Sequence, residues 1–201
     1  MGVWQFHFCN TSSLLIFFQG FHCLILQSNL AKTLILMRHA KSSWNNSHKD
    51  DFDRPLNSRG RENAQMVAKH IHSLGFKPEL TLCSSAVRCK ETLELVIPYF
   101  PKKTHIRYLD DLYLAPERTI LEMVKSIELS IDQMLVIGHN PGLSDLSQSL
   151  IYASKKQSDY FETPQFPTSA ASIFEMSIKN WLDFKSSESK IIDFITPKNL
   201  M

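Results

Sequence analysis

Two uninterrupted apolar runs, LILM at residues 34–37 and MLVI at residues 134–137, constrain the fold of this chain most strongly. A strand that is apolar at every position, rather than at every second one, is typical of a parallel sheet covered on both faces. Arg38 and His39 follow the first run directly, and His139 follows the second after one glycine. Arginine and histidine resist full burial unless another group pairs with them. We therefore expect both strand ends to face a site.

The rest of the chain alternates between helix and strand patterns. Over residues 57–76, apolar residues recur at spacings of three and four, Asn57 or Ser58 can cap the helix, and Gly75 can end it. A strand is expected at 79–85, a helix at 87–97, a weaker strand at 104–109 and a helix at 116–127. After the second apolar run, a helix is expected at 141–151, followed by two strands at 171–178 and 190–196. This order predicts an α/β fold with three layers, α/β/α, around a mostly parallel central sheet.

Charged and imidazole side chains follow three of the expected strands. In such sheets ligands bind outside the carboxyl ends of the strands, so these side chains should meet in one pocket. A guanidinium presents a rigid fork of donors that matches phosphate oxygens, and the helix starts just after Ser85 and Asn140 add amide donors. The pattern therefore favours an anion site. Its expected members are Arg38, His39, Arg88 and His139.

Composition argues against several other classes of function. With 22 Lys and Arg against 20 Asp and Glu, the net charge of +2 gives no field that would attract nucleic acid. A metal site is a weak candidate, because two histidines beside two arginines would repel a divalent cation and no Cys or carboxylate cluster completes the coordination. We expect neither a nucleic-acid partner nor a metal.

The cysteines indicate the compartment and raise one alternative nucleophile. Cys9, Cys23, Cys83 and Cys89 are few for a chain of 201 residues and lack the C-x-x-C spacing, which favours a reducing, cytoplasmic setting over a disulfide framework or a zinc ribbon. Cysteine-dependent phosphatases carry C-x5-R, and Cys83 and Arg88 are one residue short of that spacing. Cys83 is therefore not the expected nucleophile.

The first part of the chain differs from the rest, since residues 1–31 contain no Lys, Arg, Asp or Glu. A secretory signal needs a basic start, and a membrane span needs about 20 mostly apolar residues. Here Gln19 and Gly20 separate two short apolar islands. We interpret residues 1–30 as an N-terminal extension outside the fold or the product of a misplaced start codon, with a weak anchor as the alternative. Residues 31–201 then form a single domain, with no membrane contact expected.

Several motifs occur in an order that resembles a known family. They are LILMRHAKSSW, DFDRPLNSRG, SSAVRCKET, LVIGHNPGLSDL and FPTSAASIFEM. Over residues 32–178 the chain resembles the histidine phosphatase superfamily, which has a phosphoglycerate mutase-like fold, and more narrowly its SixA-type phosphohistidine phosphatases. The resemblance implies a hydrolase that needs neither metal nor cofactor. Its implied substrate is a phosphorylated protein such as a histidine phosphotransfer domain.

The resemblance also implies roles for individual residues. His39 matches the nucleophile, which attacks phosphorus in line and carries a transient phosphoryl group that water then removes. Arg54 is either a further phosphate ligand or an ion-pair partner. Ser85 and Asn140 are expected as supporting donors or helix caps. In the family, a pocket holds the phosphoryl oxygens and stabilises their charge in the transition state. The residues of this chain that match the pocket are Arg38, Arg88 and His139.

The general acid is the least determined role. Asp51 fits the family pattern D-x-x-R-P-L, while Asp53, Asp111 and Glu117 remain open. An alkoxide that leaves a phosphoserine needs a proton, whereas the imidazole of a phosphohistidine protonated on its other nitrogen departs neutral, with a conjugate acid of pKa near 6.5. A weak or absent acid would therefore suit phosphohistidine better than phosphoserine.

The covering of the pocket bears on substrate size. Sugar-phosphate mutases and acid phosphatases of the superfamily carry large insertions, but only about 35 residues separate Pro98 from Gln133. This minimal lid predicts a shallow, open groove that suits a phosphorylated side chain on a protein better than a small metabolite that needs enclosure. Two other functions stay open: a broad-specificity phosphomonoesterase for small molecules on the same site, and a non-catalytic phosphate-binding module.

Overall fold

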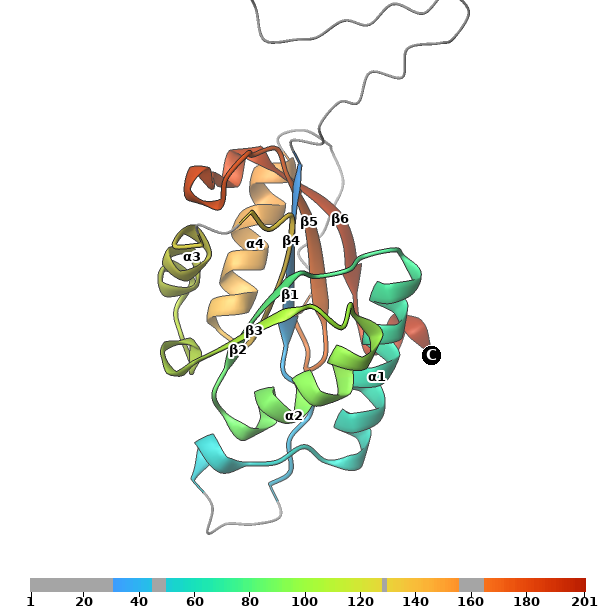
Figure 1. The fold of residues 1–201 in the computed structure, drawn as a ribbon. Helices are drawn as coiled ribbons and strands as arrows, with labels where there is room; N and C mark the ends of the chain where they lie inside the picture. Colours follow the sequence, from blue (N-terminus) through green and yellow to red (C-terminus); the bar gives the residue numbers. More distant parts are fainter. Residues whose placement is uncertain (1–30, 45–49, 128–129, 156–164) are drawn as a thin grey trace, which may run out of the picture.

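A mixed six-stranded sheet forms the centre of the molecule (Figure 1). The computed structural model describes residues 31–44, 50–127, 130–155 and 165–201. The strands are β1 (Lys32–Arg38), β2 (Leu80–Ser84), β3 (His105–Leu109), β4 (Gln133–Gly138), β5 (Ala171–Met176) and β6 (Ser189–Ile195). Their order across the sheet is β3-β2-β4-β1-β5-β6; β3, β2, β4 and β1 are parallel, and β5 pairs antiparallel with both β1 and β6. The predicted mostly parallel sheet is confirmed.

Helices cover both faces of this sheet. They are α1 (Ser58–Ser73), α2 (Val87–Val96), α3 (Glu117–Lys125) and α4 (Gly142–Lys155). Apolar side chains of α1 and α2 pack on one face, and those of α3 and α4 pack on the other. Short 3₁₀ turns follow several elements, at Asp51–Asp53, Ile97–Tyr99, Asp110–Leu112, Trp181–Asp183, Ser186–Glu188 and Pro197–Leu200. The predicted α/β/α layers are therefore confirmed.

The LILM run explains why β1 shows no alternation in its sequence. Leu34 and Leu36 pack against the α3 and α4 layer, whereas Ile35 and Met37 pack against the α1 and α2 layer. All four side chains are fully buried. Alternate side chains of a strand point to opposite faces, so both faces must be apolar when helices cover both.

The helix ends follow the sequence signals closely, with two shifts. Asn57 caps α1 by accepting a hydrogen bond from the Gly60 N–H at 2.8 Å, and Gly75 adopts a φ of 87° just after the helix, where a side chain would be strained. Pro116 precedes α3 rather than lying in its first turn. The chain after α2 continues through Pro98 as a 3₁₀ turn, because proline is tolerated at the start of a helical turn.

The register between β1 and β4 positions the two histidines. Arg38 pairs with Gly138 in the parallel ladder, and the His39 N–H donates to the Gly138 carbonyl at 3.0 Å. His39 and His139 therefore leave adjacent strands at the same level, at the carboxyl edge of the sheet.

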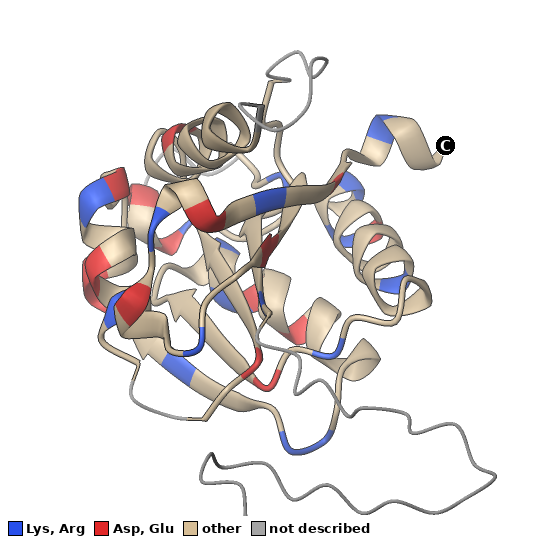
Figure 2. Cartoon of the chain, turned by 90° about the horizontal axis from the view of Figure 1, so that it is seen from above, with Lys and Arg blue, Asp and Glu red and all other residues tan. Residues whose placement is uncertain are grey.

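Two expectations concern features beyond the fold itself. The extension at residues 1–30, and the anchor weighed for it, lie outside the described residues. Within the described residues, no helix is both long and apolar enough to cross a membrane. In the view of Figure 2, basic and acidic residues are interspersed along the elements, in keeping with the net charge of +2.

Candidate active site

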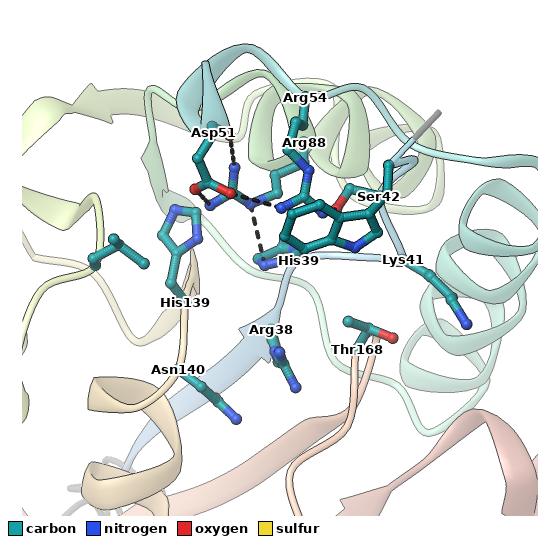
Figure 3. A pocket seen from close by; sticks show the side chains of 12 residues that line it. Arg38, His39, Lys41, Ser42, Asp51, Arg54, Arg88, His139, Asn140 and Thr168 are labelled. Carbon is teal, nitrogen blue, oxygen red and sulfur yellow. Dashed lines mark hydrogen bonds and ion pairs between the residues drawn. The ribbon is translucent and has the colours of Figure 1, made fainter. Parts of the chain in front are cut away.

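A cavity of about 370 Å³ lies at the carboxyl ends of β1 and β4 (Figure 3). It brings together all but one of the eight residues that the sequence predicts for the site. Its lining residues are Arg38, His39, Lys41, Ser42, Trp44, Asp51, Arg54, Arg88, Leu114, His139, Asn140 and Thr168. The exception is Ser85, which is buried outside this lining, whereas its neighbour Ser84 contacts His139.

His39 is held with one ring nitrogen available for attack. Its Nδ1 lies 2.8 Å from the carbonyl oxygen of Ala40. A carbonyl can only accept a hydrogen bond, so Nδ1 carries the proton and Nε2 carries the lone pair. Burial, together with the nearby charge of Arg88, lowers the pKa of His39 to about 4. The ring is therefore neutral at pH 7, which is the protonation state of a nucleophile.

Arg88 lies between His39 and Asp51. Its Nε donates to Nε2 of His39 at 3.3 Å, and its Nη2 donates to Oδ2 of Asp51 at 2.8 Å. Its Nη1 donates to the backbone carbonyl of Asp51. The residue is almost fully buried in the first turn of α2. The guanidinium therefore lies directly beside the attacking nitrogen of His39, with its two terminal nitrogens bound to Asp51.

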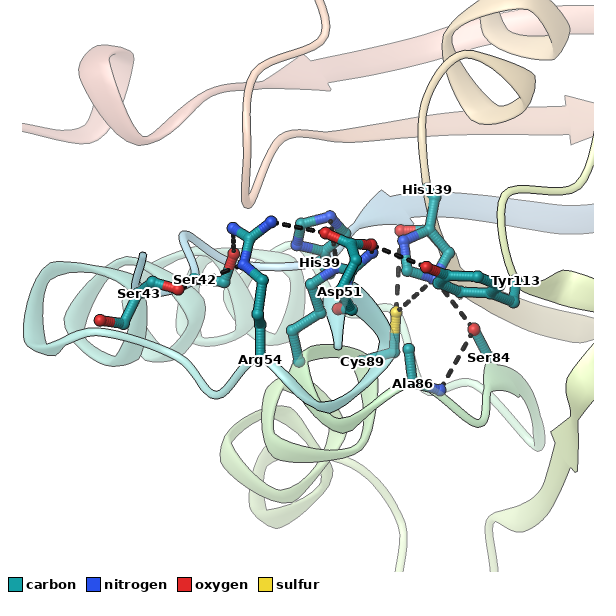
Figure 4. A network of polar contacts seen from close by, with 12 residues as sticks. His39, Ser42, Ser43, Asp51, Arg54, Ser84, Ala86, Cys89, Tyr113 and His139 are labelled. Carbon is teal, nitrogen blue, oxygen red and sulfur yellow. Dashed lines mark hydrogen bonds and ion pairs between the residues drawn. The ribbon is translucent and has the colours of Figure 1, made fainter. Parts of the chain in front are cut away.

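The Asp51 carboxylate accepts hydrogen bonds from two arginines and a tyrosine (Figure 4). Its Oδ1 lies 2.6 Å from Nη1 of Arg54, and the Tyr113 hydroxyl donates to its Oδ2 at 2.7 Å. Burial alone would raise the pKa of Asp51, but the bonds from Tyr113, Arg54 and Arg88 lower it to about 2. The carboxyl group is therefore ionised and has no proton to donate in this state. Its role as general acid stays a prediction, and it requires a change in these partners.

Arg54 is an ion-pair partner, and its role as a phosphate ligand stays a prediction. It lines the cavity and also pairs with Asp51. Its Nη2 donates to the Ser42 hydroxyl at 2.5 Å, and its Cζ lies over the Trp44 ring, 3.2 Å from the ring centroid. Stacking on an aromatic face and several hydrogen bonds fix the guanidinium. Of the other carboxylates weighed as the acid, Asp53, Asp111 and Glu117, none lines the cavity.

His139 is buried beside His39, with 5.0 Å between the ring centroids. Its Nε2 lies 2.9 Å from the Ser84 hydroxyl and 3.4 Å from Sγ of Cys89. The Tyr113 ring stands nearly perpendicular to the His139 ring, with 5.3 Å between the ring centroids. Burial first, and then His39 and Arg88, lower the pKa of His139 to about 3. This ring too is neutral at pH 7.

Arg38 and Asn140 share one backbone acceptor. Nη1 of Arg38 and Nδ2 of Asn140 each donate to the carbonyl of Phe166 at 3.0 Å. Nε of Arg38 and Oδ1 of Asn140 are buried without a hydrogen-bond partner among the described residues. Both side chains reach the cavity. The segment that carries Phe166 and Thr168 thus completes its wall.

The cysteine alternative is wrong for a physical reason. Cys83 is fully buried on the sheet face that α1 and α2 cover, and burial raises the pKa of its thiol far above the ordinary value. Only the thiolate attacks, and a buried thiol in apolar surroundings is inert.

Among the described residues, no group of three or more His, Cys, Asp and Glu could hold a metal ion.

Some functional contacts carry no signal in the sequence. Tyr113 reaches Asp51 and His139 from the chain that follows β3, which no motif marks. Ser84 lies one position before the predicted Ser85, and side chains alternate along a strand. An error of one residue at a strand end therefore selects the wrong side chain.

The two depressed histidine pKa values make stability depend on pH. In the unfolded chain both rings protonate near pH 6.5, whereas in the folded protein they resist protonation down to about pH 4 and about pH 3. The unfolded state therefore binds more protons below pH 6.5, and acid destabilises the fold by about 1 kcal/mol per pH unit for each ring. We expect the free energy of unfolding in urea to fall between pH 6.5 and pH 4. His39→Asn and His139→Asn should each reduce this slope by about half; a wild-type slope of zero would contradict the two shifts.

Comparisons with known proteins agree with the geometry. A family model described as "Histidine phosphatase superfamily (branch 1)" matches residues 34–112. The solved structure of a Nakamurella multipartitia protein, assigned as a phosphohistidine phosphatase SixA, superposes with a TM-score of 0.72 at 25% identity, covering 83% of this chain and 96% of that one. A structure from Agrobacterium tumefaciens with the same assignment has a TM-score of 0.67 at 26% identity, covering 83% of this chain and 98% of that one.

A curated relative extends beyond this match. An uncharacterised chloroplastic protein of Arabidopsis thaliana is 31% identical over 140 residues, which make up 64% of this chain and 63% of that protein. The chain therefore matches less than two thirds of that relative's length.

Proposed function

We propose that this chain, as a histidine-dependent hydrolase of the histidine phosphatase superfamily, removes phosphoryl groups from phosphohistidine on a partner protein. The observation that carries the proposal is the convergence of Arg38, His39, Arg88 and His139 on one cavity. Two neutral imidazoles beside two guanidiniums form a site that attracts a dianionic phosphoryl group and also presents a nucleophile to it.

In the first chemical step, the lone pair on Nε2 of His39 attacks phosphorus. The bond from phosphorus to the substrate imidazole breaks, and its electron pair leaves with that imidazole, which departs neutral if its other nitrogen is already protonated. Arg38 and Arg88 neutralise the charge on the phosphoryl oxygens, and His139 supplies a further hydrogen bond. In the second step, water attacks phosphorus, the bond to Nε2 of His39 breaks, and inorganic phosphate leaves.

The state of Asp51 supports phosphohistidine as the substrate. Its pKa of about 2 means that the free enzyme holds no protonated carboxyl group at this position. A phosphoserine leaves as an alkoxide and needs a proton, whereas an imidazole leaving group does not. The incoming phosphoryl group competes with Asp51 for Arg88, so Asp51 must yield that contact when the substrate binds.

The rim of the cavity supports a protein substrate. Trp44 is 75% exposed and Leu114 is 50% exposed, and both side chains line the cavity. Exposed aromatic and aliphatic side chains around a charged centre are typical of surfaces that bind another protein. A histidine phosphotransfer domain is a partner of the required chemistry.

A cytoplasmic compartment is supported by the two free cysteines among the described residues, Cys83 and Cys89.

The experiment compares substrates under one condition. We expect kcat/KM to be highest for a phosphohistidine on an intact phosphotransfer domain, lower for a phosphoserine peptide and lowest for sugar phosphates. Equal or higher values for sugar phosphates would instead favour a small-molecule phosphomonoesterase. Binding of inorganic phosphate without turnover of any of these substrates would identify a phosphate-binding module.

A further inference from the structure

Ser84 lies against the catalytic cavity but has no part in the mechanism above. It is the last residue of β2, its side chain is fully buried, and its Oγ lies 2.9 Å from Nε2 of His139. Figure 4 shows this contact beside those of Ala86 and Cys89. A fully buried hydroxyl in contact with an active-site imidazole decides which ring nitrogen carries the proton.

The direction of this hydrogen bond follows from the other contacts of the hydroxyl. A serine hydroxyl has one hydrogen to donate and two lone pairs to accept with. The Ala86 N–H donates to Oγ of Ser84 at 3.4 Å and so uses one lone pair. Among the described residues, the hydroxyl hydrogen has two acceptors within reach: Nε2 of His139 at 2.9 Å and the sulfur of Cys89, which also shares a hydrogen bond with Ser84 but is the weaker acceptor. The arrangement therefore favours donation from Ser84 to Nε2.

Cys89 does not oppose this direction. Its Sγ lies 3.4 Å from the same Nε2, and a thiol is a weak donor and a weak acceptor. Burial raises the pKa of Cys89 to about 12, so it keeps its hydrogen. The Cys89 thiol itself has an acceptor in the Gly138 carbonyl, to which it donates at 3.9 Å, so the Ser84 hydroxyl is the remaining donor beside Nε2 of His139 among the described residues.

The other ring nitrogen of His139, Nδ1, lacks the neighbouring donor that Nε2 has. Nδ1 is buried and has no hydrogen-bond partner among the described residues. The ring lines the cavity, next to the ring of His39 (Figure 3). A neutral imidazole has a single N–H, so a proton held on Nδ1 becomes a donor with no acceptor in the protein. An oxygen of a phosphoryl group on His39 is an acceptor of the right kind.

We propose that Ser84 is a positioning residue that donates to Nε2 of His139 and thereby holds the ring proton on Nδ1, from which it is donated to a phosphoryl oxygen. The inference rests on the proposed function and adds a residue to it. In the other tautomer, the lone pair of Nδ1 would face the phosphoryl oxygens and repel their negative charge. Ser84 thus determines whether Nδ1 of His139 attracts or repels the phosphoryl oxygens in the transition state.

The first test observes the tautomer directly in the full chain. Long-range ¹H–¹⁵N spectra distinguish a protonated from an unprotonated ring nitrogen, and a His139→Gln sample assigns the signal. We expect Nδ1–H in the wild type and a shift of the proton toward Nε2 in Ser84→Ala. A wild-type His139 with its proton on Nε2 would overturn the inference, even in an active enzyme.

The second test separates the hydroxyl from the shape of the side chain. Ser84→Thr keeps the hydroxyl, and Ser84→Val replaces it with a methyl group of similar size. We expect kcat/KM for phosphohistidine to fall about 10- to 100-fold in Ser84→Ala and in Ser84→Val relative to Ser84→Thr, which is the matched control. Equal rates and equal tautomers in the Thr and Val variants would refute the role of the hydroxyl. A wild type that turns over no phosphorylated substrate would refute the proposed function instead, and the spectra would still decide the tautomer.

Discussion

Replacing His39 with alanine is expected to lower the rate of phosphohistidine hydrolysis by about 10⁴-fold or more, because the substitution removes the nucleophile itself. Its Nε2 is the unprotonated ring nitrogen in the cavity, fixed in that state by the bond from Nδ1 to Ala40. Water is the remaining nucleophile in the variant, because the other imidazole that lines the cavity, His139, has its Nε2 in contact with Ser84 and Cys89. Single-turnover measurements with a phosphorylated phosphotransfer domain give the rate.

The control for this prediction is phosphate binding. His39→Ala leaves Arg38 and Arg88 in place, so we expect its dissociation constant for inorganic phosphate to stay within a few-fold of the wild-type value. A variant that binds phosphate but does not hydrolyse has lost the chemical step alone. Hydrolysis at the wild-type rate would rule out His39 as the nucleophile.

Replacing Arg88 is expected to have the second largest effect. Arg88→Ala should lower kcat/KM by about 10³-fold, because it removes a guanidinium aimed at the developing charge, and Arg88→Lys should recover only part of this loss, since an ammonium lacks the planar fork. Arg88 donates to His39 and twice to Asp51. The substitution also removes a charge that lowers the pKa of His39, so the acid limb of the pH profile should move to higher pH.

A second arginine provides the matched control. Arg61 pairs with Glu91 at 2.8 Å on an exposed part of α1, and such surface pairs contribute little. We expect Arg61→Ala to leave kcat/KM and the pH profile unchanged. A loss in Arg61→Ala equal to that in Arg88→Ala would point to general destabilisation rather than to a role in the site.

The strand-end residues were predictable because a parallel sheet converts a position in the sequence into a position in space. Arg38, His39 and His139 each follow a run of buried apolar residues, so their meeting requires only that β1 and β4 are neighbours. The sequence does not state that adjacency, since β2 and β3 intervene along the chain. The antiparallel pairing of β5 with β1 and of β6 with β5 is likewise absent from their apolar patterns.

The residues that tune the site were less accessible to prediction. Asp51 was predicted to lie in the site, but its ionised state depends on Tyr113, which is 62 positions away in the chain. The choice between Ser84 and Ser85 depends on the last residue of a strand, where a shift of one position changes the face. Such contacts are set by packing between elements, which periodicity and capping signals do not encode.

Phosphoryl trapping tests the central claim most directly. Wild-type protein is mixed with a ³²P-labelled phosphotransfer domain, quenched in alkali within one turnover, and digested for mass spectrometry. The account predicts a transient phosphoryl group on His39 that forms and decays at rates consistent with kcat and is absent from His39→Ala. A phosphoryl group on Cys83 or on any other residue, or turnover without a covalent intermediate, would contradict it.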